Sequence, residues 1–325
     1  MTDKAWKPDR ALRLGTRRSP LALAQSRRVA EEVRTLTGHP VELVEITTYG
    51  DTSRESLARI GGSGVFVTAL REALLRGEVD FAVHSLKDLP TTEPEGLTLA
   101  AVPVREDVRD VLVARDGLTL EQLPAGARVG TGAPRRMAQL GAYARSRDRA
   151  FETVPIRGNV DTRIGYVRRG ELDAVVLAAA GLHRIGRTEE VTDFLSVDTV
   201  LPAPGQGALA VECAAVDVDL AAALAGLDDP HSRVAVTAER SLLAALEAGC
   251  SAPVGALADL LADGQVVNEM RLRGVVGTTD GSTLVQLSTT GPVPMSHGDA
   301  VALGRELASE MLAKGAAGLM GERAL

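Results

Sequence analysis

Aromatic side chains are scarce in this chain: they make up 2% of its 325 residues. Proteins that bind single-stranded nucleic acid stack successive bases on aromatic rings, so this composition argues against that function. The net charge of −7 argues in the same way against a basic face for duplex nucleic acid. The two cysteines, Cys213 and Cys250, are too few for a disulfide framework. We therefore expect no nucleic-acid partner and no disulfide scaffold.

Long apolar runs are also missing. The stretch from Ala174 to Leu182 is far shorter than the ~20 residues that a membrane helix needs. The N-terminal residues MTDKAWKPDRALRLGT lack the apolar core of a secretory signal. Hydrophobic residues at 45% and charged residues at 24% are ordinary for a globular protein, and at one domain per ~150 residues the length suggests two or three domains. The sequence thus predicts a cytoplasmic protein of several domains with no membrane segment.

Lysine is rare as well. Of the 36 basic residues only four are lysines, and the other 32 are arginines. Genomic base composition explains a general bias of this kind. It leaves Lys87 conspicuous, because this lysine stands inside the motif AVHSLKDLP (82–90).

Short β-type runs alternate with helical patterns through the first two-thirds of the chain. A helix is predicted over 21–36, because Ser19 and Pro20 provide a capping residue and a first-turn proline, and Gly38 ends the pattern. Alternating strands and helices predict an α/β fold with parallel sheets covered by helices. The strand candidates are Leu12–Gly15, Val41–Thr47, Phe81–His84, Thr98–Val102, Val111–Ala114, Arg128–Gly130, Thr153–Ile156 and Ala174–Leu177.

The sequence echoes itself twice. RLGT (13–16) recurs as RVGT (128–131), and RGEVD (76–80) recurs as RGELD (169–173). Two echoes in the same order predict two related α/β lobes that flank a cleft, where ligands bind at the carboxyl ends of the strands. The connections between the lobes are expected near residues 104–109 and 200–205.

The pattern changes after Asp228-Asp229-Pro230. A helix predicted over Ser232–Ala248 is followed by short strands and a final helix, so we expect a small domain of α+β type. The strand candidates are Leu257–Leu261, Gln265–Val276 and Ser282–Thr289.

Arginines gather where strands lead into helices. Arg17 and Arg18 follow the first strand, and Arg135 and Arg136 follow the matching strand of the second lobe. Guanidinium groups bind carboxylates through two hydrogen bonds, so several arginines at strand ends predict a polyanionic ligand, and a phosphate ligand fits equally well. The alternative is that each arginine is solvated or pairs with one of the plentiful Asp and Glu residues. Further candidates of this kind are Arg157, Arg163 and Arg184.

Two other motifs carry reactive side chains. In AVHSLKDLP, Asp88 follows a strand and is a candidate general acid or base, or a stabiliser of a developing cation. A turn aspartate is the alternative, and His84 is expected to be a packed strand-end residue. In EAGCSAPVGA (247–256), Cys250 lies in a loop and is a candidate reactive thiol, whereas Cys213 fits a buried, inert one. Segment 49–64 is either a lid or a plain surface loop, and no metal site is predicted.

Eight segments, in this order and spacing, make the chain resemble the porphobilinogen deaminase (hydroxymethylbilane synthase) family over almost its whole length. Any one of them alone would be unspecific. They are GTRRSPLALAQ (15–25), GGSGVFV (61–67), AVHSLKDLP (82–90), VGTGAPRR (129–136), IRGNVDTR (156–163), AGLHRIG (180–186), PAPGQGALAVEC (202–213) and GCSAPVGA (249–256).

The resemblance implies two α/β lobes similar to type II periplasmic binding proteins, and a small α+β C-terminal domain. We place the domains at 1–104 with 203–226, at 105–202 and at 227–325. The resemblance also implies a dipyrromethane cofactor, bound to Cys250 through a thioether. The implied activity is that of a cytoplasmic, monomeric transferase. It deaminates four porphobilinogen molecules and joins them head to tail onto the cofactor, and water then releases linear hydroxymethylbilane.

The resemblance assigns the catalytic role to Asp88. Its carboxylate would stabilise the azafulvenium cation that forms from porphobilinogen as ammonia leaves, and would later help remove the ring proton. Ser63 and Phe66 are implied lid residues. Two positions depart from the family, which often has serine or threonine at Gly132-Ala133 and lysine at Ser63. The positions implied to bind acetate and propionate carboxylates are Arg17, Ser19, Lys87, Thr131, Arg135, Arg136, Arg157, Arg163 and Arg184.

Two other functions compete with this one. A solute-binding or effector-sensing module of the same two-lobed fold would need neither a modified cysteine nor Asp88, and fold alone does not fix function. A phosphate-binding transferase is disfavoured because the sequence has no P-loop pattern.

Overall fold

The protein divides into two compact units, which are described separately. The computed structural model describes residues 10–47, 64–148, 151–249, 252–263 and 266–320. The first unit comprises Met1–Arg105 and Ala208–Arg233, and the second comprises Glu106–Gly207 and Val234–Leu325. The predicted three-domain division and the predicted cleft between lobes stay predictions.

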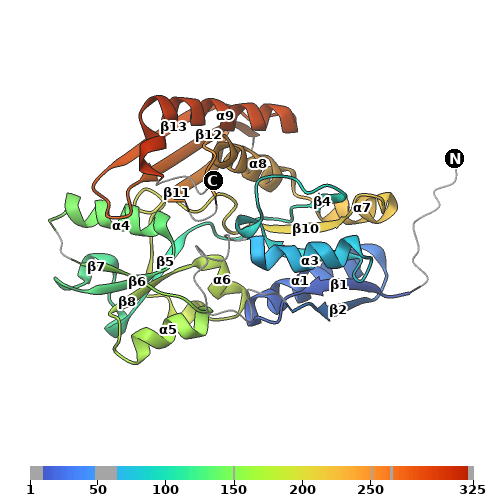
Figure 1. Ribbon diagram of the computed structural model, residues 1–325, viewed down its shortest axis with the longest axis horizontal. Helices are drawn as coiled ribbons and strands as arrows, with labels where there is room; N and C mark the ends of the chain where they lie inside the picture. The colour runs from blue at the N-terminus through green and yellow to red at the C-terminus, as the bar shows by residue number, and fades with distance from the viewer. Residues whose placement is uncertain (1–9, 48–63, 149–150, 250–251, 264–265, 321–325) are drawn as a thin grey trace. The chain divides into compact units, whose positions relative to one another are not determined.

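The first unit is built on a five-stranded sheet of order β2-β1-β3-β10-β4. Strands β1, β2 and β3 are parallel, as predicted, but β10 runs antiparallel to both of its neighbours. The reason is that β10 enters the sheet after the chain has passed through the second unit, so no strand–helix–strand crossover sets its direction. In Figure 1 the yellow strand β10 lies beside strands coloured blue and cyan.

Strands β1, β2, β3 and β4 agree with the predicted strands to within two residues, whereas β10 was not among the strand candidates. The strands are β1 (Leu12–Thr16), β2 (Val41–Glu45), β3 (Phe81–Ser85), β4 (Leu97–Ala101) and β10 (Leu209–Ala214). The helices are α1 (Pro20–Thr37), α3 (Gly64–Leu75), α7 (Val218–Leu224) and the 3-10 turns η1 (Leu86–Asp88) and η5 (Ala225–Leu227).

Helix α1 begins and ends as the sequence predicts. The Ser19 hydroxyl accepts a hydrogen bond from the Ala22 N–H at 3.2 Å, and proline occupies the first turn. Gly38 ends the helix with φ of 73°, a left-handed conformation that favours glycine, and its N–H donates to the Arg34 carbonyl. The short turn between β1 and α1 thereby carries Arg17 at the end of a buried strand.

The second unit contains a sheet with the same plan, of order β7-β6-β8-β5-β9. Strand β6 pairs in parallel with β7 and β8, whereas β5 is antiparallel to β8 and β9. The two echoing segments RLGT and RVGT form β1 and β6, the central strands of the two parallel triplets. The repeat predicted from the sequence is therefore present in the strand order.

Helices and short turns connect these strands. The strands are β5 (Asp110–Ala114), β6 (Arg128–Thr131), β7 (Glu152–Pro155), β8 (Ala174–Ala178) and β9 (Asp193–Phe194). The helices are α4 (Pro134–Ser146), α5 (Val160–Arg168), α6 (Ala179–Arg184) and the 3-10 turns η2 (Arg115–Gly117), η3 (Leu120–Gln122) and η4 (Thr188–Glu190).

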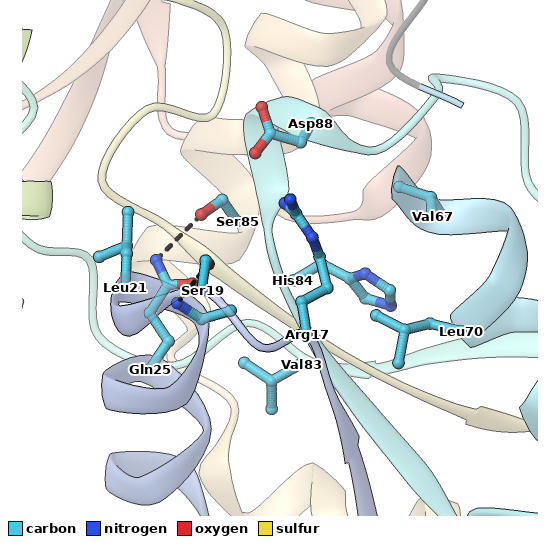
Figure 2. Close-up of a pocket in the computed structure, with 11 residues that line it drawn as sticks. Arg17, Ser19, Leu21, Gln25, Val67, Leu70, Val83, His84, Ser85 and Asp88 are labelled. Atoms are coloured by element: carbon cyan, nitrogen blue, oxygen red, sulfur yellow. Dashed lines mark hydrogen bonds between the residues drawn. The ribbon is translucent and has the colours of Figure 1, made fainter. Parts of the chain in front are cut away.

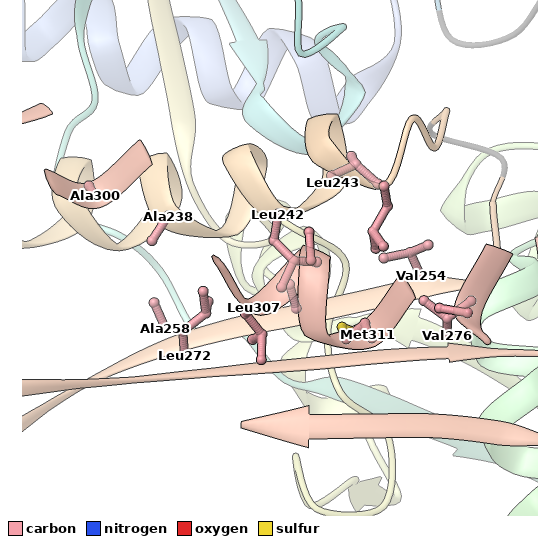
Figure 3. Packing of buried hydrophobic residues seen from close by; sticks show 14 of the residues in the cluster. Ala238, Leu242, Leu243, Val254, Ala258, Leu272, Val276, Ala300, Leu307 and Met311 are labelled. Carbon is pink, nitrogen blue, oxygen red and sulfur yellow. The ribbon is translucent and has the colours of Figure 1, made fainter. Parts of the chain in front are cut away.

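The C-terminal part is an antiparallel three-stranded sheet with helices, which confirms the predicted α+β character. Leu242, Leu272 and Met311 are fully buried between the sheet and the helices α8 and α9 (Figure 3). The elements are α8 (Pro230–Ala245), β11 (Val254–Asp263), β12 (Val266–Gly277), β13 (Leu284–Pro292), α9 (His297–Ala313) and the 3-10 turn η6 (Ala316–Leu319).

Candidate functional site

A pocket opens at the carboxyl ends of the parallel strands β1 and β3 in the first unit (Figure 2). Open α/β sheets bind ligands at this edge. The pocket combines a guanidinium, a carboxylate, two hydroxyls and an imidazole with an apolar floor. Its lining residues are Arg17, Ser19, Leu21, Ala22, Gln25, Val67, Leu70, Val83, His84, Ser85 and Asp88.

Asp88 enters the pocket from a 3-10 turn rather than from the irregular loop that the sequence predicts. The turn follows β3 directly, and the buried side chains of Leu86 and Leu89 hold it against the core. The Leu86 N–H donates to the Ala208 carbonyl at 3.0 Å, which ties the turn to the chain just before β10. Asp88 is half-buried and lines the same pocket as Arg17, whose side chain points toward Asp88 in Figure 2.

Gln25 and Ser85 are pocket residues that sequence reasoning missed. Gln25 is buried on α1 and its side-chain amide donates to the Ser85 hydroxyl at 2.9 Å. The signal was available, because a glutamine lies on the buried face of a helix and a serine stands at the end of a buried strand. Lys87 is half-buried next to Asp88 and is not among the residues that line this pocket.

Arg18 pairs with Glu45 at 3.2 Å in the first unit, and the remaining predicted arginines belong to the second unit. Arg135 and Arg136 lie in the first turn of α4 and are buried. Their guanidinium groups donate to the two carboxylate oxygens of Asp110, at 2.8 and 2.7 Å. Asp110 begins β5, is fully buried, and accepts a further hydrogen bond of 2.8 Å from Gln206. Burial would raise the pKa of Asp110, but the two guanidiniums hold it well below its usual range.

The remaining cationic candidates are more accessible. Arg157 is exposed in the turn before α5, and Arg163 is half-buried with its Nε donating to the Gly158 carbonyl at 2.9 Å. Arg184 ends α6 and donates to the Gly207 carbonyl at 2.6 Å. Thr131 is buried at the end of β6, where its hydroxyl accepts from the Ala133 N–H at 3.3 Å. Thr131 ends β6 and Arg157 follows the parallel strand β7, so these two residues lie at the carboxyl ends of neighbouring strands.

Gly132 lies against the backbone after β7. A Cβ atom at this position would lie 2.5 Å from the Ile156 carbonyl oxygen, so a larger side chain here would require the backbone to shift. Cys250 and Ser63 lie outside the described residues, and Phe66 belongs to the first turn of α3.

A buried ion-pair chain lies behind the pocket. Glu212 on β10 accepts two hydrogen bonds from Arg71 on α3, at 3.0 and 2.7 Å, and its Oε2 lies 3.2 Å from His84 Nε2. His84 is thus the packed strand-end residue that the sequence predicts, with an acidic partner that it did not predict. The neighbouring Cys213 is also buried, and its burial, with Asp217 and Glu212, raises the pKa of its thiol to about 11, as expected for an inert cysteine.

Acid should weaken the protein through Glu212. Burial would raise the pKa of its carboxyl, but hydrogen bonds from His84 and Arg71 lower it from 4.5 to about 2. The carboxylate therefore contributes its full stabilisation above pH ~4.5, and this contribution, about 3 kcal/mol, is lost as the pH falls toward 2. We expect the unfolding free energy of a Glu212→Gln variant, measured with urea, to change less between pH 4.5 and 2 than that of the unmodified protein. Equal changes in both proteins would contradict the assignment.

Comparisons with known proteins agree with the motifs. The family model described as "Porphobilinogen deaminase, dipyromethane cofactor binding domain" matches residues 12–222, and that of the C-terminal domain matches 234–313. The chain is 82% identical to porphobilinogen deaminase 1 of Streptomyces avermitilis and 80% identical to that of Streptomyces coelicolor, each over 97% of this chain and 99% of the relative. It is 57% identical to porphobilinogen deaminase of Thermobifida fusca, over 94% of both chains.

Among solved structures, an arginine-specific periplasmic binding protein of Salmonella typhimurium is similar at a TM-score of 0.40 and 14% identity, over 69% of this chain and 96% of that chain. This likeness carries no conclusion about ligand or function.

Two α/β sheets, a pocket that contains both a guanidinium and a carboxylate, a C-terminal α+β part and the matched family models define a transferase of tetrapyrrole biosynthesis. The chain belongs to the porphobilinogen deaminase family. It deaminates four porphobilinogen molecules, joins them head to tail onto a covalent dipyrromethane cofactor and releases linear hydroxymethylbilane. No helix among the described residues is long and apolar enough to cross a membrane.

Proposed function

We propose that Asp88 is the catalytic carboxylate of this reaction, and that Arg17 and Ser19 hold a ligand carboxylate beside it. The observation that carries the proposal is the shared pocket: the three side chains come from the ends of β1 and β3 and line one cavity. A carboxylate and a guanidinium in one half-buried pocket suit a ligand that carries both a pyrrole N–H and carboxylate groups.

Deamination of porphobilinogen requires a fixed negative charge beside the pyrrole ring. As ammonia leaves porphobilinogen, the pyrrole nitrogen pushes electrons outward and the ring becomes an azafulvenium cation. A carboxylate hydrogen-bonded to the pyrrole N–H stabilises this cation more than the neutral ring, which lowers the barrier by ~3–4 kcal/mol for one well-aimed group. The same carboxylate then accepts the proton released when two rings are joined.

The pocket also fits the dipyrromethane cofactor. Its donor set provides a cation and hydroxyls for acetate and propionate side chains, and a carboxylate for pyrrole N–H groups. When bound, the cofactor supplies the pyrrole carbon on which the product chain is built. Arg17, Ser19 and Asp88 would bind and orient it, and Cys250 would attach it.

The arginines of the second unit are proposed to bind the remaining carboxylates. The buried set of Arg135, Arg136 and Asp110 contains two cations and one anion, so it carries an excess positive charge that supports an anionic ligand. Each added ring brings two more carboxylates, which accounts for many arginines in an acidic protein. The other residues proposed for this role are Lys87, Thr131, Arg157, Arg163 and Arg184.

The cofactor assignment predicts a mass. Purified protein should be heavier than its sequence by two linked pyrrole units, and Cys250→Ser should lack this extra mass because no thiolate remains to form the thioether. Cys213→Ser is the matched control and should keep the added mass, since that thiol is buried. Unmodified protein that is nevertheless active would refute the attachment. The measurement is intact-protein mass spectrometry.

We also propose that the enzyme works as a monomer in the cytoplasm, without a nucleic-acid partner. Net charge of −7 and a buried free thiol at Cys213 support a reducing compartment and no nucleic acid. Native mass spectrometry of the same preparation counts the subunits, and a stable dimer would contradict the proposal.

A further inference from the structure

Three ionisable side chains from three elements meet behind the pocket wall. Arg71 of α3 holds both carboxylate oxygens of Glu212, and Glu212 in turn faces the imidazole of His84. Glu212 is 2% exposed and His84 is 6% exposed, so this chain is almost dry. His84 is both a member of the chain and a lining residue of the pocket.

The position of His84 connects the chain to the reacting centre. His84 and Ser85 are the last residues of β3, and the turn that carries Asp88 follows at once. Successive residues of a strand point to opposite faces, and in Figure 2 Ser85 points toward α1 and His84 toward α3. On the first face Gln25 donates a hydrogen bond to Ser85, and on the second face a carboxylate oxygen of Glu212 lies 3.2 Å from Nε2 of His84. The end of β3 is therefore fixed from both sides.

A buried ion pair is costly to break, but it stabilises a fold little more than well-packed apolar side chains would. The cost of removing charges from water consumes most of their attraction, and apolar side chains of the same volume would pack as well. Charged hydrogen bonds instead restrict the geometry. Arg71 donates to both carboxylate oxygens of Glu212, and these two bonds fix the position of α3 relative to the sheet. The benefit is greatest where a side chain has to be held to within a fraction of an ångström.

We infer that Arg71, Glu212 and His84 are positioning residues that fix the end of strand β3 and, through it, the carboxylate of Asp88. The inference rests on the catalytic role proposed for Asp88. A displacement of about 1 Å at a reacting group costs up to ~100-fold in rate. Loosening the strand end should thus lower kcat more than it raises KM, since the charge on the pyrrole develops only in the transition state.

The test is a double-mutant cycle on purified, cofactor-loaded protein. Glu212→Gln keeps the shape and removes the charge, and we expect kcat to fall ~10-fold with KM changed less than ~3-fold. In an Asp88→Asn background the same substitution should have no further effect on single-turnover porphobilinogen consumption, because no charge remains to be positioned. If Glu212→Gln folds poorly, Arg71→Lys keeps the charge but loses the two-pronged contact, and the same cycle applies.

Asp80→Asn is the matched control. Asp80 immediately precedes β3 and is held by Arg10 and Arg13 at 2.7 and 2.9 Å, so it is a carboxylate between two cations at the other end of the strand. This variant should lose stability to thermal unfolding but keep kcat. Hydrogen exchange gives a readout that does not depend on activity: the amides of Leu86 and Leu89 should exchange faster in Glu212→Gln and not in Asp80→Asn.

The possible outcomes distinguish the positioning role of Glu212 from the catalytic role of Asp88. Unchanged kcat in Glu212→Gln would overturn the positioning role. So would a double variant whose loss of activity equals the product of the two single losses, and in both cases Asp88 would remain catalytic. Normal turnover by Asp88→Asn alone would instead refute the role of Asp88 itself. A kcat loss in Asp80→Asn as large as in Glu212→Gln would show that any weakening of the sheet suffices, and would also overturn the inference.

Discussion

Porphobilinogen consumption by an Asp88→Asn variant is expected to be ~100-fold or more below that of the unmodified enzyme. Asparagine keeps the shape and much of the hydrogen bonding of the side chain but deletes its charge. The transition state then lacks the anion that stabilises the cationic ring. Folding should be nearly unchanged, because Asp88 is half-buried in an open pocket and the buried leucines beside it hold the turn. The measurement is substrate consumption by folded, cofactor-loaded protein.

Asp88→Glu separates charge from geometry. It retains the carboxylate but displaces it, so we expect more activity than in Asp88→Asn and less than in the unmodified enzyme. Intact-protein mass spectrometry should show the same cofactor in all three proteins, which ensures that the comparison concerns chemistry rather than loading. Near-normal consumption by the asparagine variant would mean that the charge is not catalytic and that the reaction has been assigned to the wrong residue.

Arg135→Leu should be the most destabilising of the arginine substitutions. Arg135 and Asp110 are both buried, and leucine would leave one carboxylate oxygen of Asp110 without its guanidinium partner in a dry environment. Removing one member of a buried ion pair costs about 3–5 kcal/mol. Urea unfolding of the purified variant measures this loss directly. Growth of the pyrrole chain should also stall, because the site loses a cation.

Arg157→Leu is the contrasting variant. Its side chain is exposed, so the unfolding free energy should change by less than ~0.5 kcal/mol. Loss of a bidentate carboxylate contact, worth roughly 1.5–3 kcal/mol, should still leave partly extended pyrrole chains attached to the enzyme, visible as discrete masses. If Arg135→Leu unfolds like the unmodified protein, the buried pairing with Asp110 does not contribute as described. If Arg157→Leu shows no stalled species, its role as a ligand is wrong.

Local sequence patterns were sufficient to predict the first helix and the strand that leads to Asp88. The cap at Ser19, the stop at Gly38 and the strand before His84 follow from short-range chemistry, and the structure confirms them. The direction of β10 was not predictable in this way, since it depends on where the chain returns after more than a hundred residues. The 3-10 turn at Asp88 was missed because three residues are too few for a periodic signal.

Long-range partners were the main omission at the site. Asp110 lies in the charged run REDVRD (105–110), and nothing local distinguishes it from its half-buried neighbours. Its burial and its pairing with Arg135 and Arg136 arise only when β5 and α4 come together. Glu212 is hidden in the same way within an otherwise apolar strand. A charged residue inside an apolar strand indicates that it has a buried partner, but which residue is the partner depends on the fold.

The strand order of the first unit constrains how the chain folds during synthesis. Strand β10 lies between β3 and β4, so β4, which ends at Ala101, has no hydrogen-bonded neighbour until Leu209–Ala214 has been made. At ~5–20 residues per second this takes roughly 5–20 s, during which the facing edges of β3 and β4 remain unpaired. The second sheet, whose last strand ends at Phe194, leaves the ribosome first. The first sheet, with the turn that carries Asp88, is therefore completed after the second sheet, whose strands lie between β4 and β10 in the sequence.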